Sequence, residues 1–207
     1  MSEARLRQFA ALVETWSARI NLVSRGDVPV LWRRHVGESL ELVPYIPAGT
    51  ERAIDLGSGA GFPGMVLAIA TGIAFTLVES DRRKAAFLLE AARQVAAPVT
   101  VVNARIEAAQ TPPAGLITAR ALAPLDKLLG LAAPHLTPGG VCLFPKGPGV
   151  AAELTLAKRF WHMRAERFAS PSAGEKCILK VSEIRHVGDE DASPQDHRGG
   201  EPERRGG

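Results

Sequence analysis

The feature that most constrains this chain is the stretch AIDLGSGAGFPG at residues 53–64. An apolar run ends in an acid, Asp55, four glycines follow, and a second apolar run begins at residue 65. Glycine accepts positive φ and lets a ligand approach the bare backbone, and Pro63 suits the first position of a helix. The pattern predicts a strand, a tight turn and a helix, with a small-molecule site at the helix N-terminus, where N–H groups and the positive dipole end are free.

The identity of that small molecule depends on Asp55. The spacing of Gly59, Gly61 and Gly64 also satisfies the dinucleotide fingerprint. A dinucleotide would place a pyrophosphate on this turn, and a carboxylate there would repel it. S-adenosylmethionine carries a sulfonium and an ammonium group, and the stretch resembles motif I of class I methyltransferases. We therefore predict S-adenosylmethionine as the ligand, and an NAD(P)-binding oxidoreductase remains the alternative.

Composition limits the class of protein. A chain of 207 residues, 46% hydrophobic and 23% charged, suits one globular domain with a small additional element. No apolar run approaches the roughly 20 residues of a membrane span, and the N-terminus lacks a signal-peptide core. Cys142 and Cys177 both lie in apolar runs, which indicates buried thiols in a cytosolic protein. We expect a cytoplasmic protein without a membrane partner.

Three segments follow from the chain's patterning. The pattern of residues 1–49 predicts an N-terminal helical cap, with helices over 3–20 and 29–43 and with Trp32 on the buried face of the second helix. Residues 50–185 alternate strands and helices, which predicts a parallel α/β sheet that two final strands close in antiparallel fashion. Residues 186–207 are polar and carry a net charge of −3, so we expect a disordered acidic tail. The remaining body carries +6, and a basic body suits a polyanionic substrate.

The expected strands lie at 52–56, 73–78, 98–102, 116–118, 141–144, 161–168 and 176–181. Candidate ligand contacts follow their carboxyl ends. Glu79 ends the second strand, where an acid can accept both ribose hydroxyls of an adenosine. Residues 103–107 follow the third strand, where we expect an adenine contact. Arg120 follows the fourth, and its guanidinium could hold a carboxylate or phosphate through paired hydrogen bonds.

Several stretches together resemble one family, the bacterial small-subunit ribosomal RNA guanine-N7 methyltransferases, also called glucose-inhibited division protein B. The matching pieces are Asn21-Leu22-Val23, Arg34-His35-Val36-Gly37-Glu38-Ser39-Leu40, residues 55–64, Arg105-Ile106-Glu107, Thr118-Ala119-Arg120-Ala121, Pro145-Lys146-Gly147 and Cys177-Ile178-Leu179-Lys180. They cover about residues 5–185. The family usually has Asp where Glu38 stands, and Ser where Thr118 or Ala104 stands.

The resemblance implies a class I, Rossmann-like methyltransferase fold with a seven-stranded, mostly parallel sheet. It implies methylation of N7 of guanine 527 in 16S ribosomal RNA, with the free rRNA or a small ribosomal subunit particle as substrate, and not DNA. By position, the family's S-adenosylmethionine contacts fall on Gly57, Phe62, Ile106, Glu107 and Arg120. Asp55, Gly59 and Glu79 come from the residues themselves.

The reaction that the resemblance implies needs no general base. Guanine N7 has a free lone pair and no proton, so an in-line transfer depends on proximity and alignment. The sequence agrees, because its five histidines lack metal-ligand spacing and we expect no metal. A methyltransferase of another RNA base is the nearer alternative, although Cys142 lies in a strand and not on a loop as a cytosine-C5 nucleophile would. Candidate RNA contacts are Arg33, Arg34, His35 and Lys146, and we expect a monomer.

Overall fold

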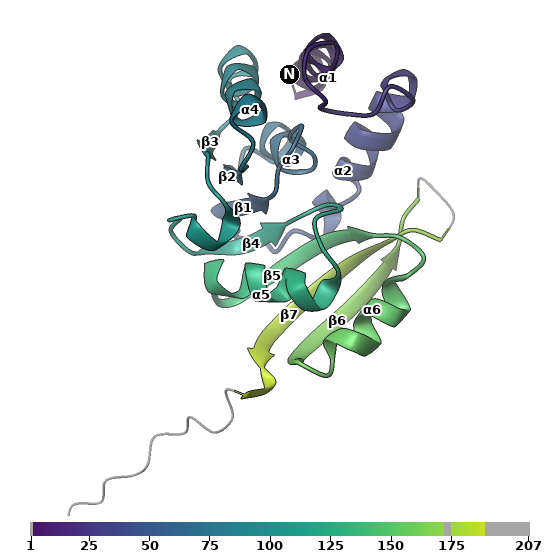
Figure 1. The fold of residues 1–207 in the computed structure, drawn as a ribbon, viewed down its shortest axis with the longest axis vertical. Coiled ribbons are helices and arrows are strands. Elements are labelled where there is room, and N and C mark those ends of the chain that lie inside the picture. Colours follow the sequence, from purple (N-terminus) through teal and green to yellow (C-terminus); the bar gives the residue numbers. More distant parts are fainter. Residues whose placement is uncertain (1, 172–174, 189–207) are drawn as a thin grey trace, which may run out of the picture.

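The structure is a computed structural model that describes residues 2–171 and 175–188. Figure 1 shows one seven-stranded sheet with helices packed on it, and its strand order is β3-β2-β1-β4-β5-β7-β6. Strands β1 to β5 run parallel, while β7 is antiparallel to both β5 and β6. The predicted α/β class, with a seven-stranded and mostly parallel sheet, is confirmed.

The strand bounds lie close to those predicted. The strands are β1 (Arg52–Leu56), β2 (Ala74–Val78), β3 (Val99–Val102), β4 (Ala114–Thr118), β5 (Leu136–Lys146), β6 (Trp161–Ala169) and β7 (Cys177–His186). The larger helices are α1 (Ser2–Ser17), α3 (Gly64–Thr71), α4 (Arg82–Val95), α5 (Leu125–Ala132) and α6 (Val150–Ala157). Strand β5 starts earlier than expected, because Pro138-Gly139-Gly140, a sequence typical of turns, is absorbed into the strand opposite a register shift in β4.

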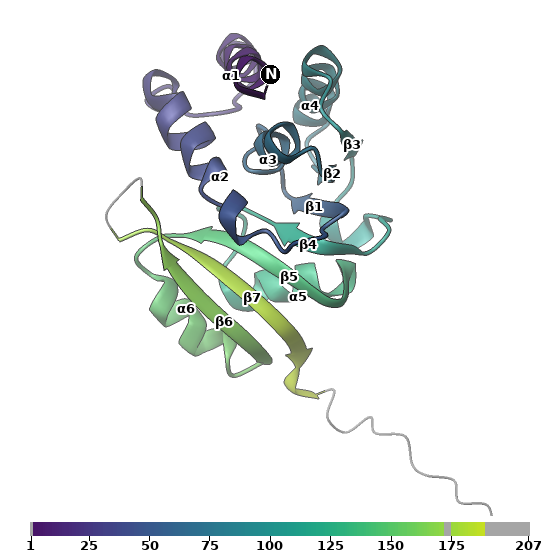
Figure 2. The same ribbon diagram turned by 180° about the vertical axis from the view of Figure 1, so that it is seen from behind.

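The two faces of the sheet bury separate hydrophobic clusters. Successive residues of a strand point to opposite faces, so Leu116 belongs to one cluster and Ile117 to the other. The first cluster packs the sheet against α1, α3 and α4, and the second packs it against α5 and α6. Figures 1 and 2 show these two groups of helices over different parts of the sheet.

The N-terminal segment shares the core of the sheet. Leu6, Phe9 and Val13 of α1 are buried, and α1 contacts α3 and α4. The expected first helix is confirmed, and its apolar stripe packs against α3 and α4.

The expected second helix over 29–43 is broken into short pieces. A 3-10 turn (Val28–Val30) leads into a π-helix (Trp32–Gly37), the short α2 (Glu38–Leu40) and another 3-10 turn (Val43–Tyr45). The wider π turn shifts the buried stripe by one residue. Leu31 is therefore buried at 1% exposure, whereas Trp32, predicted to be buried, is 36% exposed.

The sheet extends to His186, beyond the predicted strand end at 181, and the Val187 N–H donates to the Phe160 carbonyl. Residues 189–207, which hold most of the expected acidic tail, lie outside the described residues. Among the residues the structure describes, no helix has the length and apolar character to cross a membrane.

Candidate active site

The glycine turn between β1 and α3 adopts the conformation that its sequence predicts. Gly57, Gly59 and Gly61 have φ values of 65°, 56° and 91°, which L side chains rarely adopt. Gly64 is needed for a different reason, because a Cβ there would lie 2.5 Å from Cβ of Asp55. The glycines thus let α3 start directly against β1 and leave the backbone of the turn bare.

Asp55 lies buried beneath this turn with 1% exposure. Its Oδ1 accepts a hydrogen bond of 2.6 Å from the Thr118 hydroxyl, while Oδ2 has no hydrogen-bond partner among residues 2–171 and 175–188. Burial raises the pKa of Asp55 to about 6, although the Thr118 hydrogen bond opposes the rise. A buried and incompletely compensated carboxylate favours a cation at the turn above it.

Glu79, at the end of β2, is fixed by two backbone groups. Its Oε2 accepts from the Gly59 N–H at 2.8 Å, and its Oε1 accepts from the Asp81 N–H at 2.7 Å. Each carboxylate oxygen can accept a further bond. Glu79 therefore joins the end of β2 to the glycine turn and retains acceptor capacity for the predicted ribose hydroxyls.

A cavity of about 270 Å³ lies at the carboxyl ends of β1, β2 and β3. It brings together three of the predicted contacts, Gly57, Ile106 and Glu107. Its remaining lining residues are Val78, Ser80, Ala104, Arg105, Leu122 and Leu131. Apolar walls, a bare glycine and an acid at the rim suit an adenosine, so the residues present fit S-adenosylmethionine.

Phe62 and Arg120 lie together beside the turn, but Phe62 is a core side chain. It is 4% exposed, its ring stacks on His35 at 5.1 Å, and the Arg120 guanidinium lies 5.3 Å from its centroid. Phe62 lines neither this cavity nor the larger one beyond Arg120, so only its backbone is part of the turn.

His35 positions Arg120. Nη2 of Arg120 lies 2.7 Å from Nδ1 of His35, which must accept this bond because a guanidinium has no acceptor. Burial and, to a smaller extent, the charge of Arg120 lower the pKa of His35 to about 4. His35 is therefore neutral near pH 7, and its Nε2 lies 3.8 Å from Oδ2 of Asp27.

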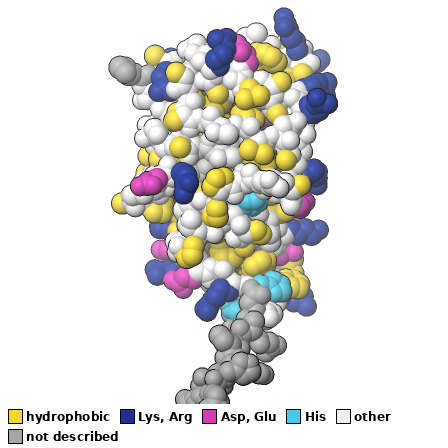
Figure 3. All heavy atoms as spheres, turned by 90° about the vertical axis from the view of Figure 1, so that its left-hand side faces the viewer, with side chains coloured by type: hydrophobic (Ala, Val, Ile, Leu, Met, Phe, Trp, Pro, Cys, Tyr) yellow, Lys and Arg dark blue, Asp and Glu magenta, His cyan; other side chains and the backbone are white. Residues whose placement is uncertain are grey.

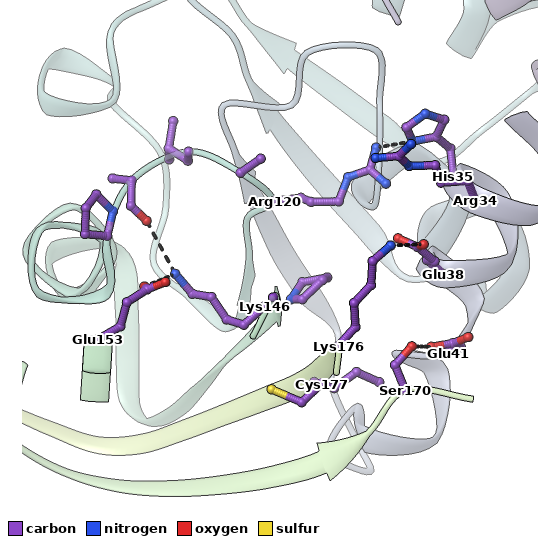
Figure 4. A pocket seen from close by; sticks show the side chains of 17 residues that line it. Arg34, His35, Glu38, Glu41, Arg120, Lys146, Glu153, Ser170, Lys176 and Cys177 are labelled. Atoms are coloured by element: carbon purple, nitrogen blue, oxygen red, sulfur yellow. Dashed lines mark hydrogen bonds and ion pairs between the residues drawn. The ribbon is translucent and has the colours of Figure 1, made fainter. Parts of the chain in front are cut away.

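A larger cavity of about 620 Å³ lies beyond Arg120, and Figure 4 shows the side chains that line it. Its walls come from the π-helix and α2, from the loops after β4 and β5, and from the hairpin that joins β6 to β7. Leu122 lines this cavity and the smaller one, so the two cavities lie on either side of that residue.

Ion pairs and hydrogen bonds hold the walls of the large cavity together. Lys146 contacts Glu153 at 2.7 Å and Lys176 contacts Glu38 at 2.5 Å. Ser170 donates to Glu41 at 2.5 Å. Sequence reasoning missed Glu38 and Lys176 as site residues, because a broken helix and a hairpin more than 130 positions apart in the chain bring them together.

The four predicted RNA contacts occupy different environments. Arg34, His35 and Lys146 line the large cavity, whereas Arg33 is exposed and lies outside it. Arg34 pairs with Asp27 at 2.6 Å, and Lys146, only 10% exposed, also donates to the Ala123 carbonyl. RNA contact by these residues stays a prediction.

Figure 3 shows the side of the molecule that lies at the left in Figure 1. On this side, Lys and Arg side chains lie mainly towards the edges of a largely uncharged surface.

The cysteines are free and buried, as predicted. Burial raises the pKa of the Cys142 thiol, which suppresses the thiolate that a cytosine-C5 nucleophile requires. Among the described residues, no three His, Cys, Asp or Glu side chains are grouped so that they could hold a metal ion.

Solved structures share this fold. A Pyrococcus furiosus methyltransferase aligns with a TM-score of 0.56 at 17% identity and covers 87% of this chain and 96% of its own. M. jannaschii TYW2 in complex with AdoMet aligns with a TM-score of 0.57 at 14% identity and covers 82% of this chain and 80% of its own. At these identities the likeness shows the class I methyltransferase fold alone.

The sequence comparisons identify the family. The family model described as rRNA small subunit methyltransferase G matches residues 2–179. The protein of Acidiphilium cryptum named ribosomal RNA small subunit methyltransferase G is 56% identical over 88% of this chain and 85% of its own length. The protein of that name from Gluconobacter oxydans is 53% identical over 88% of this chain and 94% of its own. With the motif I turn and its two adjoining cavities, these matches show that the chain belongs to the rRNA small subunit methyltransferase G family of S-adenosylmethionine-dependent enzymes.

Proposed function

We propose that this enzyme methylates N7 of guanine 527 in 16S ribosomal RNA, by in-line transfer and without a general base. The observation that carries the proposal is the pair of cavities that meet at Leu122, one suited to an adenosine and one roomy enough for a flipped-out base. Family membership sets aside the oxidoreductase alternative.

S-adenosylmethionine, when bound, would supply the methyl group that the N7 lone pair accepts, with a neutral thioether as the leaving group and a cationic guanine as the product. The chain's own residues bind and align. Glu79, Ile106 and Glu107 would hold the adenosine, the bare turn at Gly57 and Gly59 would admit the rest of the donor, and the Asp55 charge would favour its cationic groups.

Arg120 is the orienting residue in this proposal. It follows β4 at the carboxyl edge of the sheet and lines the large cavity, and His35 fixes one of its nitrogens. The remaining guanidinium donors could hold a carboxylate of the donor or a phosphate of the RNA. His35 accepts a hydrogen bond from Arg120 through Nδ1, so that nitrogen is not free to remove a proton, and N7 carries none to remove.

The proposed partner is 16S rRNA, free or in a small ribosomal subunit particle, bound by a monomer. The positive body charge and the arginines at the cavity rim support a polyanion as substrate. Arg34 is 53% exposed there and can reach a phosphate while paired with Asp27. We propose a cytoplasmic location, because that is where this substrate is found.

The direct test is to map N7-methylguanine in 16S rRNA from cells that lack this protein. Reduction followed by aniline cleaves RNA at N7-methylguanine, so primer extension locates the modification. We expect the signal at position 527 to vanish in the deletion strain and to return with the wild-type gene but not with an Arg120→Ala gene. A signal that persists in the deletion strain would refute the proposal, and loss of a different modification would favour methylation of another RNA base.

A further inference from the structure

One acid of the large cavity, Glu38, has a partner for only one of its two carboxylate oxygens among the described residues. Glu38 begins α2 directly after the π-helix, its side chain is 13% exposed, and its Oε1 lies 2.5 Å from Nζ of Lys176. Its Oε2 makes no hydrogen bond within residues 2–171 and 175–188. Figure 4 shows Glu38 pointing into the cavity across from Lys146.

The other two acids of the cavity have structural partners. Oε2 of Glu153 accepts from the Leu125 N–H and from Lys146, so it ties two loops together. Oε2 of Glu41 accepts from Ser170 and joins the broken helix to the hairpin. Burial lowers the pKa of Arg120, and Glu38 is the acid that most strongly opposes this change. It is therefore the carboxylate best placed to meet a base oriented by Arg120.

We propose that Glu38 selects guanine by accepting hydrogen bonds from N1–H and from the N2 amino group of the target base, an inference that rests on the proposed function. These two adjacent donors match the two oxygens of one carboxylate. Adenine presents an acceptor at N1 and a C–H at position 2, so the same carboxylate would repel it. Glu38 is then a specificity-determining residue.

The contact leaves N7 free to react. N7 lies on the purine edge next to the one that carries N1–H and the N2 amino group, and its lone pair points roughly at right angles to the N1–H bond, so a guanine held by Glu38 keeps N7 open towards a side wall of the cavity. Lys146 lies across the cavity from Glu38 and donates to the Ala123 carbonyl, so the loop that carries Leu122 forms part of the cavity wall. Beyond Leu122 lies the smaller cavity.

The contact would also strengthen during the reaction. The purine gains a positive charge as N7 gains the methyl group, and its N1–H and N2–H become stronger donors to a carboxylate. An interaction that is stronger in the transition state than in the ground state accelerates the chemical step. Lys176 holds the Glu38 carboxylate in place, and Oε1 can still accept a second bond.

The test compares guanine with inosine, which lacks the N2 amino group. Small subunits are reconstituted with 16S rRNA that carries guanosine or inosine at position 527, and single-turnover rates of N7 methylation are measured. The unaltered enzyme should prefer guanosine by about tenfold, the loss expected for one hydrogen bond to a charged group. Glu38→Gln keeps one acceptor oxygen for N1–H, but its amide N–H would face the N2 amino group, which is also a donor. The ratio of the guanosine rate to the inosine rate should therefore fall to about one.

Lys176→Met is the matched control, because it breaks the same ion pair and keeps the carboxylate. Whatever its rate, its preference for guanosine should remain near the wild-type value. Affinity for the two reconstituted subunits, measured with S-adenosylhomocysteine present, should follow the same order, and thermal melting checks that both variants fold. An unchanged preference in Glu38→Gln would overturn the inference and leave N7 methylation standing. No N7 methylation by the wild-type enzyme would overturn the proposed function itself.

Discussion

The Thr118 hydroxyl donates a hydrogen bond of 2.6 Å to Oδ1 of Asp55 and so joins β4 to β1 beneath the glycine turn. Both side chains are buried, at 0% and 1% exposure. Thr118→Val keeps the shape and removes the donor. It should cost about 1–3 kcal/mol of stability at pH 8, where Asp55 is ionised, and less at pH 5. Denaturant unfolding at the two pH values measures this, and Thr118→Ser, which keeps the hydroxyl, should lose less.

Asp55 itself should make stability depend on pH. Its folded pKa of about 6 lies above the ordinary value of 3.8. At a pH between these two values, the folded state therefore holds a proton that the unfolded state has lost. Stability is therefore greatest below the ordinary value and falls as pH rises through 6, by about 3 kcal/mol. Asp55→Asn lacks this fall, so the difference between the two unfolding curves should widen from pH 4 to pH 7. A constant difference would contradict the raised pKa.

The same carboxyl should link ligand binding to pH. A cation binds the ionised form better, so calorimetry should show S-adenosylmethionine affinity weakening as pH drops below about 6. Asp55→Asn should bind weakly at every pH. S-adenosylhomocysteine lacks the sulfonium charge and serves as the matched ligand, with a smaller pH effect expected. Equal pH dependence in wild type and Asp55→Asn would mean that another group is responsible.

Gly57 and Gly59 form a matched pair for testing the turn. Both have positive φ, but a Cβ on Gly57 would lie 2.7 Å from Cδ1 of Leu122, whereas a Cβ on Gly59 meets no atom nearer than 3.9 Å. Gly59→Ala should cost about 1–2 kcal/mol of backbone strain, and Gly57→Ala should cost more. Adding Leu122→Ala should recover part of the loss in Gly57→Ala and none in Gly59→Ala. Equal losses of stability in the two single variants would show that the loop carrying Leu122 moves aside at little cost in free energy.

Arg120→Lys should lower the single-turnover methylation rate at least tenfold, because lysine cannot reproduce the guanidinium fork that His35 holds. Arg159→Lys, at an exposed position outside both cavities, is the control and should leave the rate unchanged. His35 stays neutral well above its pKa of about 4, so the wild-type rate should be nearly flat from pH 7 to 8.5. A rate that rises tenfold per pH unit would indicate an essential base.

Much of the fold and of the donor site follows from local pattern. The turn at residues 57–64 and the acid at Glu79 follow the ends of neighbouring parallel strands, so topology alone brings them together. Ile106 and Glu107 reach the same cavity by the same rule. These parts were predictable because each depends on a strand end and on residues close to it in the chain.

The wall of the large cavity could not be predicted in this way. The π-helix at Trp32–Gly37 breaks the 3.6-residue period, so the pattern that buried Trp32 failed and Glu38 was not recognised as facing the cavity. Lys176 reaches Glu38 only because the hairpin of β6 and β7 passes the broken helix. Likewise, the ring of Phe62 is packed between Phe9 and His35, a contact of three distant segments.

The position of β7 also has a consequence for synthesis on the ribosome. Among the described residues, the last strand along the chain lies between β5 and β6, so β6 emerges before β7, with which it pairs. Until Cys177–His186 has left the exit tunnel, β5 presents an open edge and β6 has nothing to bind it in register. A nascent chain can therefore complete the small cavity at the ends of β1, β2 and β3 before the large one, to which β7 contributes, and we expect it to expose the open edge of β5 until then.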